Sequence, residues 1–427
     1  MVTPVPLVNI PREVMSTDMR PRTTTALYQT VARVWLTLAA LSLLLPPERR
    51  MGIWLPLHLA SAGAVATAIS GAMQNFMLAL TASPDPPAWS TWTQLGLVVA
   101  GAGLIAIGMP TSTSWLTAVG GTAFVAAMAI LAWMLRRAWH MSLNKRHPFP
   151  MAAYGVAVLA ALIGGTLGAL LGSHAVVGET YLYFKRAHMT LNVLGFASLT
   201  VVGTLVTLLP TALRVRMPQW KGWAALMLFA GGLLLQLVGW GLASTPVLAA
   251  GGIAYGAGAL GLVWLVISVL RIERKWKVPV AAMHMMAAVA WFVSGSLAFA
   301  WALVRGPGGF DAFRSNFLIA FVGGWLVQIL LGAWAYLLPM ARPGHPGSRR
   351  RELSAFEMAA PVQLALLNVG LALMALRAAG WTGPGAGDLG VILACFGAGM
   401  ALVKAWLFPV MSLGPVDTER ARAVWGG

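Results

Sequence analysis

Long apolar runs constrain this chain more than any other feature, because each is as long as a helix that crosses a membrane. A helix rises about 1.5 Å per residue, so roughly 20 apolar residues cross the hydrocarbon core of a bilayer. Such runs occur twelve times, at residues 25–46, 53–80, 92–110, 113–135, 151–172, 186–209, 222–242, 246–270, 279–304, 315–339, 360–378 and 388–409. The sequence therefore predicts an all-α polytopic membrane protein with about twelve transmembrane helices in one domain, residues 25–409.

The composition fits a protein surrounded by lipid. Only 10% of the residues are charged and 59% are hydrophobic, whereas a soluble domain carries about 25% charged residues. The single cysteine, Cys395, excludes a disulfide framework and a cysteine-based metal cluster. We therefore expect the lipid bilayer to be the main partner of the protein surface.

The basic residues are distributed unevenly between the two ends of the predicted spans. With the N-terminus placed in the cytoplasm, 20 of the 29 Lys and Arg residues fall on the inner side and 7 on the outer side, while Arg33 and Lys404 lie within spans. This is the positive-inside bias of membrane proteins. The net charge of +17 then faces anionic lipid, and no nucleic-acid partner is needed. We expect cytoplasmic tails at residues 1–24 and 410–427.

Spans two, six and ten share a pattern that indicates an internal repeat. Each contains two glycines separated by seven residues: Gly63 and Gly71, Gly195 and Gly203, Gly324 and Gly332. The sixth span ends in "GTLVTLLP" and the tenth in "GAWAYLLP", 129 residues later. Small residues also serve ordinary helix packing in bilayers. The shared ends and the regular four-helix interval nevertheless favour a pseudo-threefold arrangement of four-helix units.

Histidine is the main chemically active residue inside the predicted spans. His188, Asn192 and Gly195 fall on one stripe of the sixth helix, at spacings i, i+4 and i+7, and His58 lies at a similar depth in the second. Neutral imidazole is the commonest transition-metal ligand and a standard axial ligand of haem. We expect His58, His188 and Asn192 to hold a cofactor toward the outer face, with His174 as a further candidate metal ligand. Hydrogen bonding between helices is the alternative role for these side chains.

Acidic residues are missing from the interior of the predicted spans. All twelve Asp and Glu residues lie in loops, in tails or near helix ends. A proton-coupled transporter usually keeps a carboxylate at mid-membrane, and a metal-dependent glycosyltransferase needs acidic ligands for its cation, so both classes are disfavoured. His284, in "MHMM" near the inner end of the ninth span, is interpreted as a core or interfacial histidine among packing methionines.

The twelve spans, the threefold repeat and the histidines of helices two and six together resemble the catalytic subunit of the haem–copper oxidases. In that family helix two supplies a haem ligand and helix six a copper ligand, so the resemblance implies haem at His58 and copper at His188. The chain lacks the family's histidine pair in helix seven, "GWAALMLFAGGLLLQLVGW", and its His-x-His in helix ten, "RSNFLIAFVGGWLVQILLGAWAYLLP". We therefore expect no oxygen reduction by this chain alone.

The segment "AHMTLNVLGFASLTVVGTLVTLLP" also resembles twelve-helix bacterial proteins related to the nitric-oxide-response membrane protein family. That resemblance implies haem or copper binding in a bacterial cytoplasmic (inner) membrane and a role in nitrogen-oxide or copper metabolism.

Three hypotheses for the function stay open at this stage. The first is a haem or copper protein for electron transfer, sensing or assembly, with a redox protein or a respiratory complex as partner. The second is a transporter or channel for a small neutral or anionic solute, and the third is a structural or assembly subunit without a cofactor. The sequence does not decide whether the chain is an enzyme.

Overall fold

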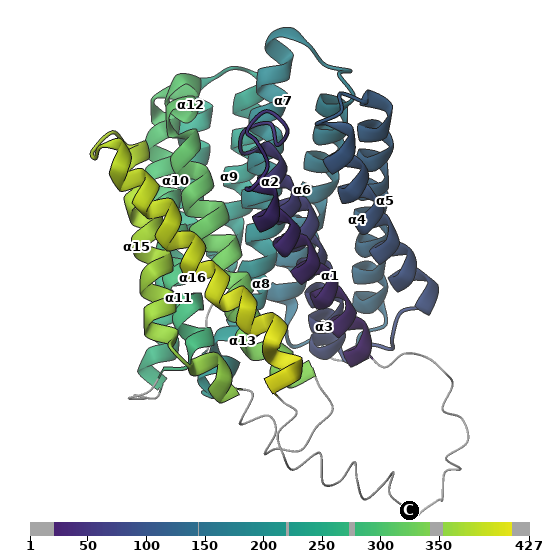
Figure 1. Ribbon diagram of the computed structural model, residues 1–427. Helices are drawn as coiled ribbons and strands as arrows, with labels where there is room; N and C mark the ends of the chain where they lie inside the picture. Colours follow the sequence, from purple (N-terminus) through teal and green to yellow (C-terminus); the bar gives the residue numbers. More distant parts are fainter. Residues whose placement is uncertain (1–20, 144, 219–221, 273–277, 342–352, 412–427) are drawn as a thin grey trace, which may run out of the picture.

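The fold is built from helices that are long enough to cross a membrane (Figure 1). The computed structural model describes residues 21–143, 145–218, 222–272, 278–341 and 353–411, and the secondary structure within these ranges is helical. Eleven helices of this described part are long and apolar enough to cross a bilayer by length and composition. These features confirm an all-α polytopic membrane protein. Residues 1–20 and 412–427 of the expected tails lie outside the described residues.

The expected count of twelve membrane-crossing helices is not confirmed. The first helix, α1 (Pro21–Ser42), has the required length but is not among the eleven. It carries the buried polar side chains of Gln29 and Arg33, which lower its mean hydropathy.

The helices follow one another as three groups of four with the same order of parts. In the first group, α1 is followed by a broken helix, α2 (Trp54–His58), η1 (Leu59–Val65) and α3 (Ala66–Thr81), and then by the pair α4 (Ala88–Gly108) and α5 (Ser114–His140). The second group comprises α6 (Pro148–Gly172), the broken helix α7 (Gly178–Thr190), η2 (Leu191–Ala197) and α8 (Ser198–Leu213), and the pair α9 (Trp223–Gly241) and α10 (Thr245–Ile272). The third comprises α11 (Val280–Val304), the broken helix α12 (Gly306–Phe317), η3 (Leu318–Val327) and α13 (Gln328–Ala341), and the pair α15 (Ala360–Ala378) and α16 (Pro384–Met411).

Each broken helix contains a π-helical segment, η1, η2 or η3, around the first glycine of its repeat pair. Hydrogen bonds in a π-helix join residues five apart, which widens the turn, and such segments are frequent at functional sites. The widened turn of η2 makes a carbonyl available to other helices: Tyr255 of α10 donates its hydroxyl to Leu194 O at 2.8 Å. The three π segments therefore mark equivalent positions in the three groups.

The second glycine of each repeat pair faces a large ring on the helix that precedes it. A Cβ atom built on Gly71, Gly203 or Gly332 would lie 2.4 to 3.0 Å from the side chain of Tyr28, Tyr154 or His284, respectively. These rings occupy corresponding places on α1, α6 and α11. Only glycine gives a helix this close approach to its neighbour. The repeat predicted from the glycine spacing is thus a repeat of helix packing.

A second set of glycines repeats within the outer helix pairs. In each pair, a Cβ atom on either glycine would meet the partner's carbonyl oxygen at 2.6 to 2.9 Å; the glycines are Gly101 and Gly120, Gly232 and Gly251, and Gly370 and Gly390. The backbones of α4 and α5, of α9 and α10, and of α15 and α16 therefore touch at equivalent points, which completes the pseudo-threefold arrangement.

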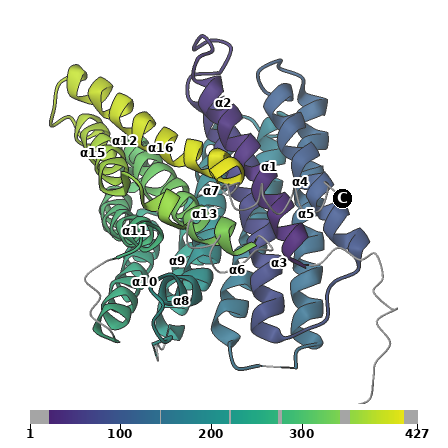
Figure 2. The same ribbon diagram turned by 60° about the horizontal axis from the view of Figure 1, so that its bottom comes forward.

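The three junctions between groups are not alike. Helix α5 packs along α6 and α10 along α11, whereas α16 runs obliquely and ends beside α1 and α13 (Figure 2). Polar contacts hold that third junction: Arg33 Nη1 donates to Ala405 O at 2.6 Å, and its guanidinium lies 4.9 Å from the ring centre of Trp406. Trp406 Nε1 in turn donates to Thr37 Oγ1 at 3.0 Å.

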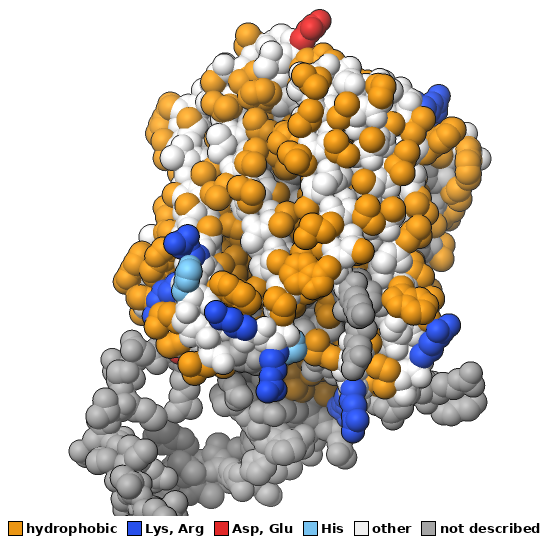
Figure 3. All heavy atoms as spheres, turned by 180° about the vertical axis from the view of Figure 1, so that it is seen from behind, with side chains coloured by type: hydrophobic (Ala, Val, Ile, Leu, Met, Phe, Trp, Pro, Cys, Tyr) orange, Lys and Arg blue, Asp and Glu red, His pale blue; other side chains and the backbone are white. Residues whose placement is uncertain are grey.

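Two of the broken helices are longer at their N-terminal ends than the apolar runs predict. The continuous helices are Gly178–Leu213 and Gly306–Met340, whereas the runs cover 186–209 and 315–339. The predicted boundaries were wrong because polar first turns, including Lys185 and Arg314, continue the helix beyond its apolar part. At the opposite end, Lys and Arg side chains gather at the lower edge of the face shown in Figure 3.

Candidate functional site

His188 lies near the end of α7, three residues before η2 begins. Its Nδ1 is 2.8 Å from the carbonyl oxygen of Gly164 on α6. Because a carbonyl oxygen can only accept, Nδ1 carries the proton, and in the neutral imidazole Nε2 keeps its lone pair. This is the tautomer that a metal-binding histidine adopts when a backbone carbonyl orients it.

Asn192 follows one turn after His188 and stabilises the same stretch of helix. Its Nδ2 donates to His188 O at 2.8 Å, which fixes the orientation of the amide. Nδ2 is also 3.1 Å from His188 Nδ1, but both nitrogens carry protons when Nδ1 donates to Gly164. Asn192 therefore supports the helix around the histidine, and its expected role in holding a cofactor stays a prediction.

Two glycines of α6 make the space that holds this pair. A Cβ atom on Gly164 would lie 2.6 Å from Asn192 Nδ2, and one on Gly168 would lie 2.5 Å from His188 Cε1. Any larger residue would push the imidazole away from its carbonyl partner. The sequence analysis missed this part of the site, although the spacing of four between the two glycines matches the spacing of His188 and Asn192.

His58 lies on the first broken helix, and a carbonyl of its own helix holds its ring. It is the last residue of α2, and its Nδ1 is 2.9 Å from Trp54 O, one turn earlier. Its ring is stacked on the indole of Trp54, with 3.9 Å between ring centroids and 21° between planes. Here too the carbonyl fixes the proton on Nδ1, so Nε2 has the available lone pair.

The two imidazoles share several properties. Both are partly buried, and both lie immediately before or within three residues of a π segment. Within the described part of the chain, no hydrogen bond is found to Nε2 of either ring. In both rings a backbone carbonyl therefore holds Nδ1, and Nε2 faces no hydrogen-bond partner among the described residues.

His174 lies apart from this arrangement. It is exposed in the turn after α6, has a left-handed backbone conformation with φ of 59°, and its Nδ1 is 2.9 Å from Ser114 Oγ. Among the residues that the structure describes, no three His, Cys, Asp or Glu side chains are grouped closely enough to hold a metal ion. His174 is therefore not brought together with His58 and His188 into a three-ligand set.

His284 is a core histidine, as the sequence analysis interprets it, but its surroundings include a buried charge. Lys404 of α16 donates to Gln363 Oε1 at 2.7 Å and to Met358 O at 2.5 Å. Because Gln363 Oε1 faces the ammonium, the amide nitrogen faces His284 Nε2, at 2.9 Å. The sequence analysis noted Lys404 only as a residue within a span, yet a lysine there indicates a partner such as this one. This network ties α16 to α15 and α11.

An ion pair joins α7 of the second group to α12 of the third. Arg186 of α7 donates from Nη2 to Asp311 Oδ2 at 2.5 Å and from Nε to Asp311 Oδ1 at 3.3 Å. The guanidinium also lies 5.5 Å from the ring centre of Trp240. This bidentate contact lies two residues from His188 and fixes the position of α7 relative to α12.

Comparison with known proteins adds no relative. No family model matches the chain, and no curated protein matches it either.

Proposed function

We propose that this membrane protein binds a copper ion or a haem iron through Nε2 of His58 and Nε2 of His188, near the outer surface of the bilayer. The observation that carries the proposal is the shared tautomer: in both rings Nδ1 is held by a backbone carbonyl, at 2.9 and 2.8 Å. A carbonyl behind the ring is a common second partner of a metal-bound histidine, and it raises the basicity of the nitrogen that faces the metal.

The packing around the site supports copper more strongly than haem. A haem would need a flat gap beside its axial ligands, and the glycines that offer close approach are already covered by protein. Gly168 faces the His188 ring itself, Gly63 faces Trp35, and Gly195 faces Ala160. Imidazole nitrogens alone suit a copper ion, which needs no gap of that size. Copper would supply one-electron redox chemistry, while these residues hold and orient it.

The distribution of charge supports an orientation with both ends of the chain inside a bacterial cytoplasmic (inner) membrane. The described Lys and Arg side chains that gather at one end in Figure 3 would then face the anionic leaflet, and the histidine pair would face outward. In that orientation the proposed protein is a degenerate relative of the haem–copper oxidase subunit. Its role would be electron transfer, sensing or assembly, together with a redox partner. The chain would not reduce oxygen alone.

Metal analysis and a visible absorption spectrum of the purified protein test this proposal. We expect about one copper ion per chain, lost in His58→Ala and in His188→Ala and retained in His140→Ala, a matched control in the terminal turn of α5. A Soret band that depends on the same two residues would assign haem in place of copper. A colourless, metal-free protein would refute the proposal, and solute flux in vesicles would then favour a transporter or channel.

A further inference from the structure

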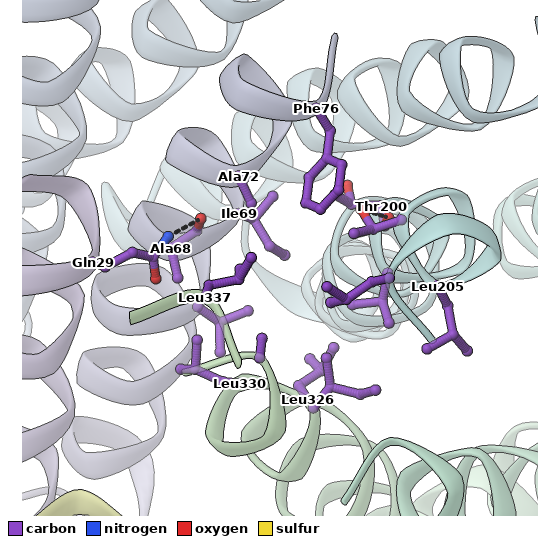
Figure 4. A pocket seen from close by; sticks show the side chains of 16 residues that line it. Gln29, Ala68, Ile69, Ala72, Phe76, Thr200, Leu205, Leu326, Leu330 and Leu337 are labelled. Atoms are coloured by element: carbon purple, nitrogen blue, oxygen red, sulfur yellow. Dashed lines mark hydrogen bonds between the residues drawn. The ribbon is translucent and has the colours of Figure 1, made fainter. Parts of the chain in front are cut away.

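A small pocket lies where the three broken helices meet (Figure 4). Its volume is about 60 Å³, and side chains of α3, α8 and α13 form most of its wall. The pocket begins where the π segments end, since Val65 closes η1 and Leu326 lies near the end of η3. Neither His58 nor His188 lines it. It is therefore a separate feature from the proposed metal site.

The wall of the pocket is almost entirely apolar. Its polar side chains are those of Gln29, Thr200 and Thr204, and each is already hydrogen-bonded within the protein. Gln29 donates to Ala68 O at 3.2 Å and accepts from Trp334 Nε1 at 2.8 Å. The two threonines donate to carbonyl oxygens one turn earlier on their own helix, at 2.8 and 2.9 Å.

This chemistry disfavours water as the occupant. A buried water is held by two to four polar partners, whereas apolar cavities stay dry and accept apolar molecules. The size of the pocket limits the choice further. An apolar cavity of about 150 Å³ accepts benzene, so a pocket of about 60 Å³ suits a molecule of only a few heavy atoms.

We infer that this pocket, on the pseudo-threefold axis of the bundle, binds a small uncharged apolar molecule. Three helices from three different groups converge on it, and Ile69, Leu205 and Leu330 line it from one helix each (Figure 4). Burial of apolar surface stabilises such a ligand without any directional contact. The ligand reaches the protein through the bilayer, where apolar solutes are concentrated.

Xenon is a suitable probe because it is apolar, uncharged and easily located in electron density. Crystals of the full chain pressurised with xenon are expected to show an anomalous peak within the pocket, bounded by α3, α8 and α13. Ala72 lines the pocket, so the larger leucine side chain in Ala72→Leu should fill it. Crystals of this variant should show no xenon peak. Ala100→Leu, on the exposed face of α4, is the control and should keep it.

Several results would overturn the inference. They are a wild-type pocket without xenon, a pocket that contains ordered water, and a pocket filled by a lipid or detergent chain. Retention of the peak in Ala72→Leu would also overturn it. If Ala72→Leu does not fold, Ala333→Leu fills the pocket from α13 and replaces it. Metal content should be unchanged in both variants, so this test fails or succeeds independently of the proposed metal site.

Discussion

The broken helices of the second and third groups follow the same backbone course but carry different side chains where the π segment begins: a polar pair in the second group and two phenylalanines in the third. A shift of 129 residues places His188 on Phe317 and Asn192 on Phe321. Both phenylalanines are fully buried. The histidine and the asparagine are partly buried and hydrogen-bonded to backbone.

The helices in front of these two sites differ in a matching way. On α6, Gly164 and Gly168 leave space for the polar pair. On α11, Gly295 likewise lies against Phe321, but a ring, that of Phe299, lies beside Phe317, with 5.5 Å between the ring centroids. The third group shows that the π-broken helix can be completed by an aromatic core. The fold therefore does not require His188 and Asn192, which is the reason to assign them a function.

Placing the histidine of the second group at the matching position of the third should have the largest effect on stability. Phe317→His removes a buried ring from contacts with Phe299, Phe310 and Phe321 and places an unpaired imidazole among apolar neighbours. Loss of a large core side chain costs about 3–5 kcal/mol, and the unpaired polar group adds to that. The thermal unfolding temperature of the purified protein measures the loss.

The reverse change, His188→Phe, should cost less, about 1–3 kcal/mol, because it mainly leaves Gly164 O without its donor. Equal losses in the two variants would show that both positions serve packing alone, and the distinction between the two regions would disappear.

Filling the glycine space on α6 should have an intermediate effect. In Gly168→Ala the new Cβ would lie 2.5 Å from His188 Cε1, so the ring or the helix must shift, and such overpacking costs about 1–3 kcal/mol. Gly155→Ala on the same helix is the control, since nothing lies within 4 Å of its Cβ position. Metal content and unfolding temperature should both fall in Gly168→Ala. Both should stay unchanged in Gly155→Ala. Full metal binding in Gly168→Ala would contradict the geometry described for His188.

The ion pair that joins the two compared regions should contribute least. Asp311 is about half exposed, with 51% of its side chain accessible, and exposed ion pairs contribute up to about 1 kcal/mol. Asp311→Asn should lower the unfolding temperature slightly at low salt and less at high salt, because salt screens the pair. Asp388→Asn, an exposed acid without a salt bridge in the described part of the chain, is the control. A loss that does not depend on salt would show that Asp311 acts by packing.

The sequence predicted the fold class and the repeat because both depend on local patterns. Long apolar runs are typical of helices in contact with lipid. The spacing of Gly63 and Gly71 recurs in each broken helix, where it packs on the helix before it. The π segments were not predicted, since no residue type requires a turn of that width. The N-terminal extensions of α7 and α12 were not predicted either, because hydropathy identifies only the apolar part of a helix, and both helices begin with polar residues.

The site was predictable only in part. His58, His188 and Asn192 stand out as polar residues in apolar spans. Their hydrogen-bond partners are main-chain carbonyls, which every residue carries, so the sequence does not identify them. Gly164 could be recognised only once α6 was known to face α7. His174 was predicted as a metal ligand because it is a histidine near the same end of the bundle as His188. Its contact with Ser114 in an exposed turn is a tertiary contact, which the sequence does not indicate.

X-ray absorption at the copper edge tests most directly whether His58 and His188 hold one metal. The copper-loaded wild-type protein is expected to show a nitrogen shell with two imidazoles. His188→Phe, which copies the residue of the third group, should remain folded and lose that shell together with stoichiometric copper. Copper held by sulfur ligands, or retained in the double variant His58→Phe/His188→Phe, would contradict the account.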